Sequence, residues 1–89
     1  MARAPARSNS SEDYSAEFGR RIRSLREQLD PSVSQEALAE RAGVHRTYIG
    51  HLELGKGSPT LDTIVRIAKA LGVDAADLVR GLQKLKGRD

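Results

Sequence analysis

A short segment near the middle of the chain, Arg46 to Leu54, carries side chains that could hydrogen-bond to nucleic-acid bases. If this segment is a helix that buries Ile49 and Leu52, the opposite face presents Arg46, Thr47, Gly50 and His51. An α-helix fits the major groove of B-DNA, where arginine can bond the O6 and N7 atoms of one guanine and a methyl group suits thymine. His51 could donate or accept a hydrogen bond at a base edge. Gly50 could let the backbone approach the groove closely, or could simply be tolerated.

The residues that catalysis or metal binding would need are missing or wrongly spaced. The chain has no cysteine, and His45 and His51 lie six positions apart, whereas the helical metal pair of HExxH lies four apart. The serines show no spacing typical of a catalytic triad, and GKGSP lacks the spacing of a phosphate-binding P-loop. We therefore expect no enzyme activity, no metal and no cofactor.

The composition predicts one small domain. The 89 residues carry 15 lysines and arginines against 12 aspartates and glutamates, which gives a net charge of +3 and a pI near 9.7. This excess fits an anionic partner but does not identify one. No apolar run reaches the roughly 18–20 residues of a membrane span, and the N-terminus lacks the apolar core of a secretory signal. We expect a cytoplasmic protein with no membrane association and no small-molecule ligand.

Apolar residues at helical spacing predict an all-α fold of five short helices. The first helix starts near Ser10 or Ser11 and ends before Pro31. Its apolar stripe consists of Tyr14, Phe18, Ile22, Leu25 and Leu29. We expect residues 1–10 to form a disordered basic arm, residues 11–86 to form the domain, and residues 87–89 to be a flexible end. The arm could be a solvated tail or could touch DNA.

Three later helices share one starting pattern, in which an apolar residue precedes the cap and meets another five positions on. The pairs are Val33 with Leu38, Val44 with Ile49, and Val73 with Leu78. The caps would be Ser34, His45 and Asp74, of which histidine is a poor cap. Glycines at positions 43, 55 and 72 mark helix ends.

The fourth and fifth helices carry the apolar residues of the C-terminal third. Thr60 would cap the fourth helix, whose expected buried face is Leu61, Ile64, Val65, Ala68 and Leu71. The fifth helix would carry Leu78, Val79, Leu82 and Leu85, with Gly81 weakening it by about 1 kcal/mol relative to alanine. We expect Val79, Leu82 and Leu85 to form a dimer surface, although folding back onto the core would also explain them.

The helices at 35–42 and 46–54, joined by a turn around Gly43, form a predicted helix-turn-helix. The run QEALAERAGVHRTYIGHLELGKGSPTL resembles that motif in the lambda-repressor-like, Cro-type bacterial and phage regulators. The matching residues are Gln35, Ala39, Gly43, Ile49, Leu52, Glu53, Gly55, Lys56 and Pro59. The likeness covers about residues 18–82. It implies sequence-specific binding to double-stranded DNA by a regulator that we expect to be a repressor.

The resemblance also implies contacts to DNA phosphates by Gln35 and Lys56. Free N–H groups at a helix start support the first of these. His45, Tyr48 and Arg41 are further candidates for phosphate contacts. Tyr48 could instead be a packing residue, and Arg41 could be only solvated.

Glu53 would repel DNA if it faced the phosphates. The resemblance instead implies an ion pair between Glu53 and Arg26 of the first helix.

Two other functions remain open. The segment RTYI resembles the controller proteins of restriction–modification systems, and related domains also occur in the antitoxins of toxin–antitoxin pairs. In each case one short helix reads few base pairs. We therefore expect a homodimer on a near-palindrome with half-sites about 34 Å apart.

Overall fold

The computed structural model describes the backbone of residues 8–85 and the side chains of residues 14–85. Within this range the chain forms five α-helices and one 3₁₀ turn, without a β-strand. The elements are α1 Ser8–Gln28, α2 Gln35–Ala42, α3 Arg46–Glu53, α4 Leu61–Leu71, α5 Ala75–Val79 and η1 Leu82–Lys84. The predicted all-α fold with five helices is confirmed.

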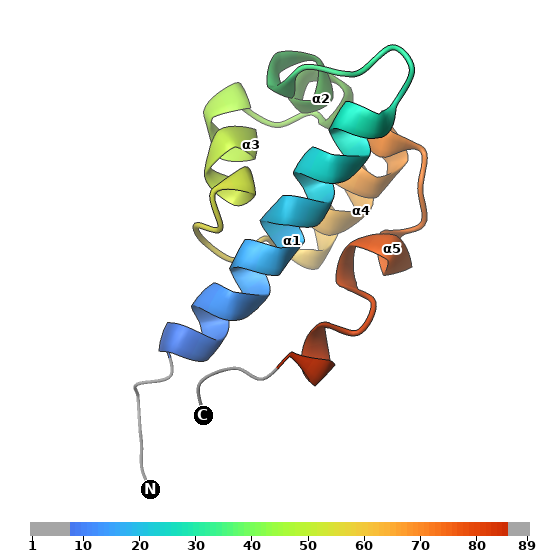
Figure 1. The fold of residues 1–89 in the computed structure, drawn as a ribbon. Coiled ribbons are helices and arrows are strands. Elements are labelled where there is room, and N and C mark those ends of the chain that lie inside the picture. The colour runs from blue at the N-terminus through green and yellow to red at the C-terminus, as the bar shows by residue number, and fades with distance from the viewer. Residues whose placement is uncertain (1–7, 86–89) are drawn as a thin grey trace, which may run out of the picture.

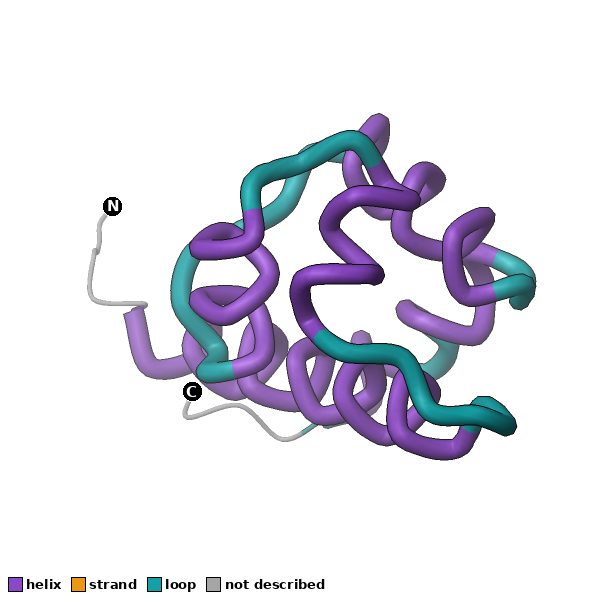
Figure 2. Tube along the Cα trace, turned by 90° about the horizontal axis from the view of Figure 1, so that it is seen from above, coloured by secondary structure: helices purple, strands orange, loops and turns teal. Residues whose placement is uncertain are grey.

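The long helix α1 organises the packing of the other helices. It runs across the front of the molecule, with α3 on one side, α5 on the other and α4 behind it (Figure 1). It packs against α3 and α5, while α2 packs against α3 and α4. Seen from above, the helices are grouped around one interior (Figure 2).

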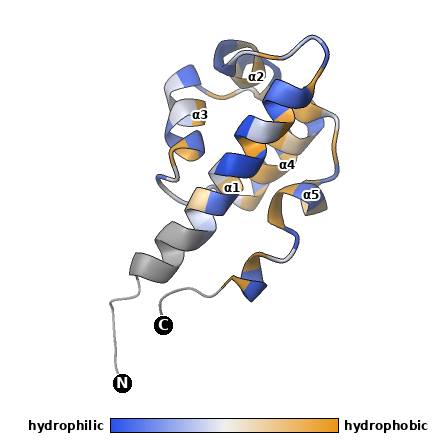
Figure 3. Ribbon diagram, viewed as in Figure 1, coloured by the Kyte–Doolittle hydropathy of each residue, from blue (hydrophilic) through white to orange (hydrophobic). Residues whose placement is uncertain are grey.

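Apolar side chains from all five helices fill this interior. Figure 3 shows apolar positions concentrated on the inner sides of the helices and polar positions on the outer sides. The largest fully buried side chains are Ile22, Leu38, Ile49, Leu52, Ile67 and Leu78. Each contributes about 1.5–3 kcal/mol relative to an exposed position. Because Ile49 and Leu52 are among them, the core fixes which face of α3 is turned outward.

Helix α1 begins earlier than the sequence predicts. It starts at Ser8 rather than near Ser10 or Ser11, so the last three residues of the expected arm are helical. No proline or glycine lies between Ser8 and Phe18 to interrupt the helical hydrogen bonds. The rest of the expected arm, residues 1–7, and the expected flexible end, residues 87–89, lie outside the described residues.

The buried face of α4 differs from the predicted one. Leu61 and Val65 are 75% and 41% exposed, whereas Ile67, which the prediction left out, is fully buried beside Ala68 and Leu71. Because Ile67 lies on the other flank of the apolar stripe, the buried side of the helix is turned away from Val65 and Leu61. Helix α4 therefore presents two apolar side chains, one turn apart, on the surface.

The predicted fifth helix is two elements. Helix α5 ends at Val79, and Gly81 adopts a left-handed conformation with φ of 74° before η1. Glycine adopts this conformation without steric cost, so Gly81 ends the helix rather than only weakening it. Leu82 and Leu85 therefore lie beyond the helix that carries Val79.

Candidate nucleic-acid interface

A glycine turn joins α2 and α3 into a helix-turn-helix. Gly43 has φ of 73°, and its N–H donates to the carbonyl oxygens of Ala39 and Glu40 at the end of α2. Ala39, only 2% exposed, is small where the helices meet. Ser34 caps α2 as predicted, because its hydroxyl oxygen accepts from the Ala37 N–H at 3.0 Å.

His45 caps α3, contrary to the expectation that it is a poor cap. Its Nδ1 atom accepts a hydrogen bond from the Thr47 N–H at 3.1 Å. An imidazole nitrogen can accept in this way, although the usual caps do so through oxygen. In a neutral imidazole the Nε2 atom then carries the proton and is left as a donor on an exposed side chain.

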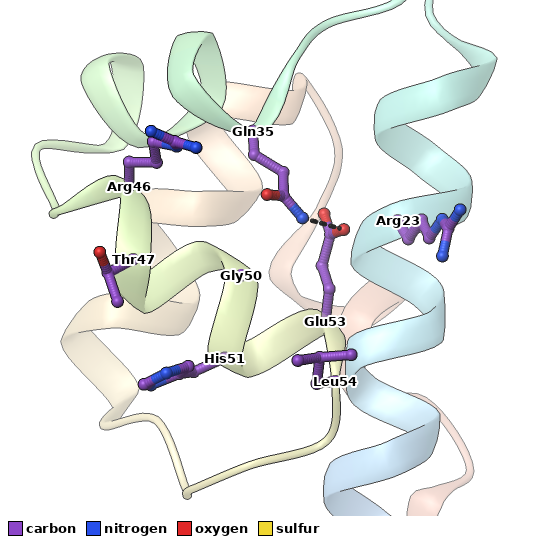
Figure 4. Close-up of a pocket in the computed structure, with 8 residues that line it drawn as sticks. All are labelled: Arg23, Gln35, Arg46, Thr47, Gly50, His51, Glu53 and Leu54. Carbon is purple, nitrogen blue, oxygen red and sulfur yellow. Dashed lines mark hydrogen bonds between the residues drawn. The ribbon is translucent and has the colours of Figure 1, made fainter.

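The four predicted base-contacting residues lie together on the outer side of α3. We call Arg46, Thr47, Gly50 and His51 the reading face. All four line one hollow, which Gln35, Glu53, Leu54 and Arg23 of α1 complete (Figure 4). We call this the α1–α3 hollow. Arg46, Thr47 and His51 are exposed, and Gly50 is half-buried. The core therefore holds the reading face turned toward solvent.

Glu53 forms the floor of the hollow and is fully paired. The guanidinium of Arg26 donates to its two carboxylate oxygens at 2.7 and 2.9 Å, and the side-chain exposures are 12% for Arg26 and 4% for Glu53. Arg26 also donates to the Val33 carbonyl oxygen at 2.9 Å. The hydrogen bonds to Glu53 raise the pKa of Arg26. The ion pair that the resemblance implied is thus present, and it compensates a carboxylate beside the reading face.

Gln35, at the start of α2, turns its side chain into the hollow. Its Nε2 atom donates to the Glu53 carboxylate at 2.9 Å (Figure 4). An amide nitrogen carries two hydrogens, so one remains for a phosphate. The side chain is therefore anchored, and its phosphate contact stays a prediction.

The other predicted phosphate contacts are spread around the reading face. Lys56 is exposed in the loop after α3, where Gly55 and Gly57 both have φ of 80°. Tyr48 is half-buried and packs against the core, which agrees with the alternative that it is a packing residue. Arg41 is exposed but lines a different hollow, beside the loop between α1 and α2.

Arg46 has a neighbour of opposite charge. One of its guanidinium nitrogens lies 3.5 Å from a carboxylate oxygen of Glu36, and both side chains are largely exposed. Exposed pairs of this kind contribute only about 0–1 kcal/mol. Glu36 can therefore release Arg46 at small cost.

Several residues that shape this interface were missed by the sequence analysis. A Cβ atom at Gly19 of α1 would collide with the Leu52 carbonyl oxygen, so this glycine lets α1 approach the end of α3. Ser15 donates to the Gly57 carbonyl oxygen at 2.9 Å and ties the Lys56 loop to α1. Gly19, a glycine within the predicted first helix, was a signal in the sequence that could have indicated this close approach. The sequence held no comparable signal for the positions of Ser15, Arg23 and Leu54.

Comparison with known proteins places this arrangement in a family. The helix-turn-helix family (HTH_3) matches residues 22–78, which include α2, the turn and α3. The chain belongs to the helix-turn-helix family of lambda-repressor-like, Cro-type transcriptional regulators. The Control protein C.BamHI of Bacillus amyloliquefaciens is 46% identical over 63 residues, which cover 70% of this chain and 75% of that protein. Control protein C.SmaI of Serratia marcescens is 43% identical over 58 residues, covering 63% and 69%.

Solved structures agree with the fold of this family member. The restriction-modification controller protein C.AhdI of Aeromonas hydrophila superposes with a TM-score of 0.67 at 36% identity, covering 72% of this chain and 94% of that one. The P22 c2 repressor, solved in complex with a synthetic operator, superposes with a TM-score of 0.64 at 30% identity and the same coverages.

The described residues contain no cluster of three or more histidine, cysteine, aspartate or glutamate side chains that could hold a metal ion. No helix in residues 8–85 has the length and apolar character needed to cross a membrane.

Proposed function

We propose that this regulator binds a near-palindromic operator in double-stranded DNA as a homodimer, with α3 in the major groove. One observation carries the proposal. The reading face lines one hollow, with Arg46, Thr47 and His51 exposed and Gly50 half-buried, and Glu53, the one carboxylate among the described residues that line it, is compensated by Arg26 and Gln35. An uncompensated carboxylate there would repel the phosphates.

Each residue of the reading face has a specific role in this proposal. Arg46, in the first turn of α3, donates two hydrogen bonds to one guanine. Thr47 contacts a thymine methyl group or a base edge, and His51 contacts the next base along the groove. Gly50 lets the helix backbone lie close to the groove.

Backbone contacts position the motif without reading sequence. We assign these to Gln35, His45 and Lys56. Gln35 is oriented by Glu53, and His45 turns a donor nitrogen outward while its other nitrogen caps α3. Tyr48 and Arg41 are weaker assignments, because Tyr48 packs on the core and Arg41 lies beside another hollow.

The homodimer is proposed through the C-terminal elements. Val79 is 37% exposed, and with Leu82, Tyr14, Ile64 and Pro59 it lines a largely apolar hollow on the side of α5. Helix α4 also exposes Leu61 and Val65. Leu85, half-buried and the last of the described residues, completes the proposed surface.

The experiment that tests the proposal is selection of bound sequences from random double-stranded DNA by the full chain. We expect a near-palindrome with half-sites one helical turn apart. A selected pool without a shared sequence would contradict the proposal.

Repression is tested by placing the selected operator over a reporter promoter and measuring transcription with and without the protein. The proposed activity is binding alone, in the cytoplasm of a bacterial or phage-infected cell.

A second, narrower function is favoured by the relatives. C.BamHI and C.SmaI are named as control proteins, and C.AhdI as a restriction-modification controller. The corresponding proposal is that this chain regulates restriction–modification genes. Finding the selected operator upstream of such genes would support it. A neighbouring toxin gene whose product co-purifies with the chain would instead indicate an antitoxin.

A further inference from the structure

The α1–α3 hollow has a wall that does not belong to the helix-turn-helix. The reading face lines one side of it, and Arg23 of α1 and Leu54 at the end of α3 also line it (Figure 4). Neither residue is among the DNA contacts expected from the sequence. Their position places a cation and an apolar side chain next to the residues that face DNA in the proposed function.

The fold does not use the Arg23 side chain. It is 65% exposed, and among the described residues its Nε atom donates to the Glu27 carboxylate, at 3.0 Å, on the same helix. That carboxylate is itself 52% exposed. Because exposed ion pairs contribute little, Arg23 can exchange this partner for another anion. Arg26, three residues later, differs because it is almost fully buried against Glu53.

The charges around the hollow favour an anion. Glu53, at the floor of the hollow, is paired with Arg26. When Arg23 and Arg46 release their exposed glutamate partners, their two positive charges are left at the hollow without a partner. Leu54, which lines the same hollow, is 70% exposed, so its side chain is available for an apolar contact. A sugar–phosphate backbone offers both an anionic oxygen and an apolar deoxyribose face.

We infer that the α1–α3 hollow receives one strand of the bound DNA, with Arg23 donating to a phosphate and Leu54 packing on the adjoining deoxyribose. This inference rests on the proposed function and extends the DNA contacts from the helix-turn-helix onto α1. The Arg23 contact fixes the angle between α3 and the groove and does not read bases.

The test compares Arg23→Gln with Arg20→Gln. Both changes remove one charge from α1, both side chains are about two-thirds exposed, and both pair with a glutamate within one helical turn. Arg20 does not line the hollow. Binding to DNA is measured between about 50 and 200 mM salt, with circular dichroism to verify folding. We expect Arg23→Gln to reduce the slope of log K against log salt by about 0.9 per half-site, or about 1.8 for the bound dimer, and Arg20→Gln to leave it nearly unchanged. Equal slopes in the two variants would overturn the inference.

A second measurement locates the contact. Operators with one neutral methylphosphonate in place of a phosphate are titrated with wild type and Arg23→Gln. At one backbone position per half-site, we expect the neutral linkage to weaken the wild type and leave Arg23→Gln unaffected. If every linkage affects both proteins alike, Arg23 makes no direct contact.

The outcomes separate this inference from the proposed function. Binding without sequence preference contradicts the proposed function, and the slope comparison on that DNA still decides the role of Arg23. A wild-type chain that binds no DNA overturns both.

Discussion

Glu53 is a carboxylate placed beside a surface that is proposed to meet polyanionic DNA. Its two oxygens accept hydrogen bonds from Arg26 and Gln35, and it is almost completely buried. Through these hydrogen bonds the Glu53 side chain links α1, α2 and α3. It also orients the Gln35 amide at the edge of the reading face.

Removing the Glu53 carboxylate should destabilise the fold. In Glu53→Ala the Arg26 guanidinium stays in its largely buried site without a carboxylate partner and keeps only its hydrogen bond to the Val33 carbonyl oxygen, so the free energy of unfolding should fall by about 3–5 kcal/mol. For a domain of this size that is a large part of the total. Urea unfolding and thermal melts measure the loss. A double variant, Arg26→Met with Glu53→Leu, removes both charges and should recover part of it. An unchanged melting temperature in Glu53→Ala would show that the pair carries no stability.

At the scale of the elements, α3 carries a glycine where helix stability would favour alanine. A Cβ atom at position 50 would meet only the Gln35 Oε1 atom, at an ordinary contact distance of 3.7 Å. The fold therefore does not require this glycine, unlike Gly19, which lies against the Leu52 carbonyl oxygen. A close approach of DNA to the α3 backbone is the remaining explanation that has a physical cause.

The Gly50→Ala variant separates the effect of Gly50 on helix stability from its effect on DNA binding. We expect the free energy of unfolding to rise by about 0.5–1 kcal/mol, because alanine loses less backbone entropy than glycine. We expect binding to the selected operator to weaken at the same time, because the methyl group occupies the space of the groove. Urea unfolding and fluorescence anisotropy measure the two effects in one protein. Stabilisation with unchanged affinity would mean that Gly50 is only tolerated.

The elements also show which features could be predicted from sequence. The starts of α2 and α4 were predictable because Ser34 and Thr60 bond to backbone N–H groups three residues away. Gly43 and Gly72 mark helix ends for a similarly local reason. Such signals lie within a few residues of the feature they specify.

Features that depend on how helices meet could not be predicted in this way. Val65 fits the apolar spacing of α4, yet it is exposed, because Ile67 determines which side faces the interior. Arg23 and Leu54 are separated by thirty-one positions in the sequence and line one hollow only because α1 packs beside α3. The Arg26–Glu53 ion pair beside the reading face was expected from the family resemblance alone, because no local sequence pattern indicates it.

At the scale of the whole molecule, the apolar surface near the C-terminus is proposed to hold two copies together. Val79→Asp would place a carboxylate in that surface at a position already 37% exposed in the single chain, so the fold should tolerate it. We expect the dissociation constant of the dimer to rise at least about tenfold in sedimentation equilibrium. The control is Ser32→Asp, which adds the same charge to the exposed loop between α1 and α2. A wild-type chain that is monomeric at high concentration, with and without DNA, would contradict the proposed dimer.

In the proposed function, α3 reads bases chiefly through Arg46. The most direct test measures the affinities of wild type and Arg46→Ala for every single-base-pair substitution of the selected operator. We expect wild type to discriminate by about 1–3 kcal/mol at one guanine-containing position in each half-site, and Arg46→Ala to lose discrimination there while keeping it elsewhere. A variant that binds all the operators more weakly by the same factor would show that Arg46 contacts only the backbone, and would contradict the claim.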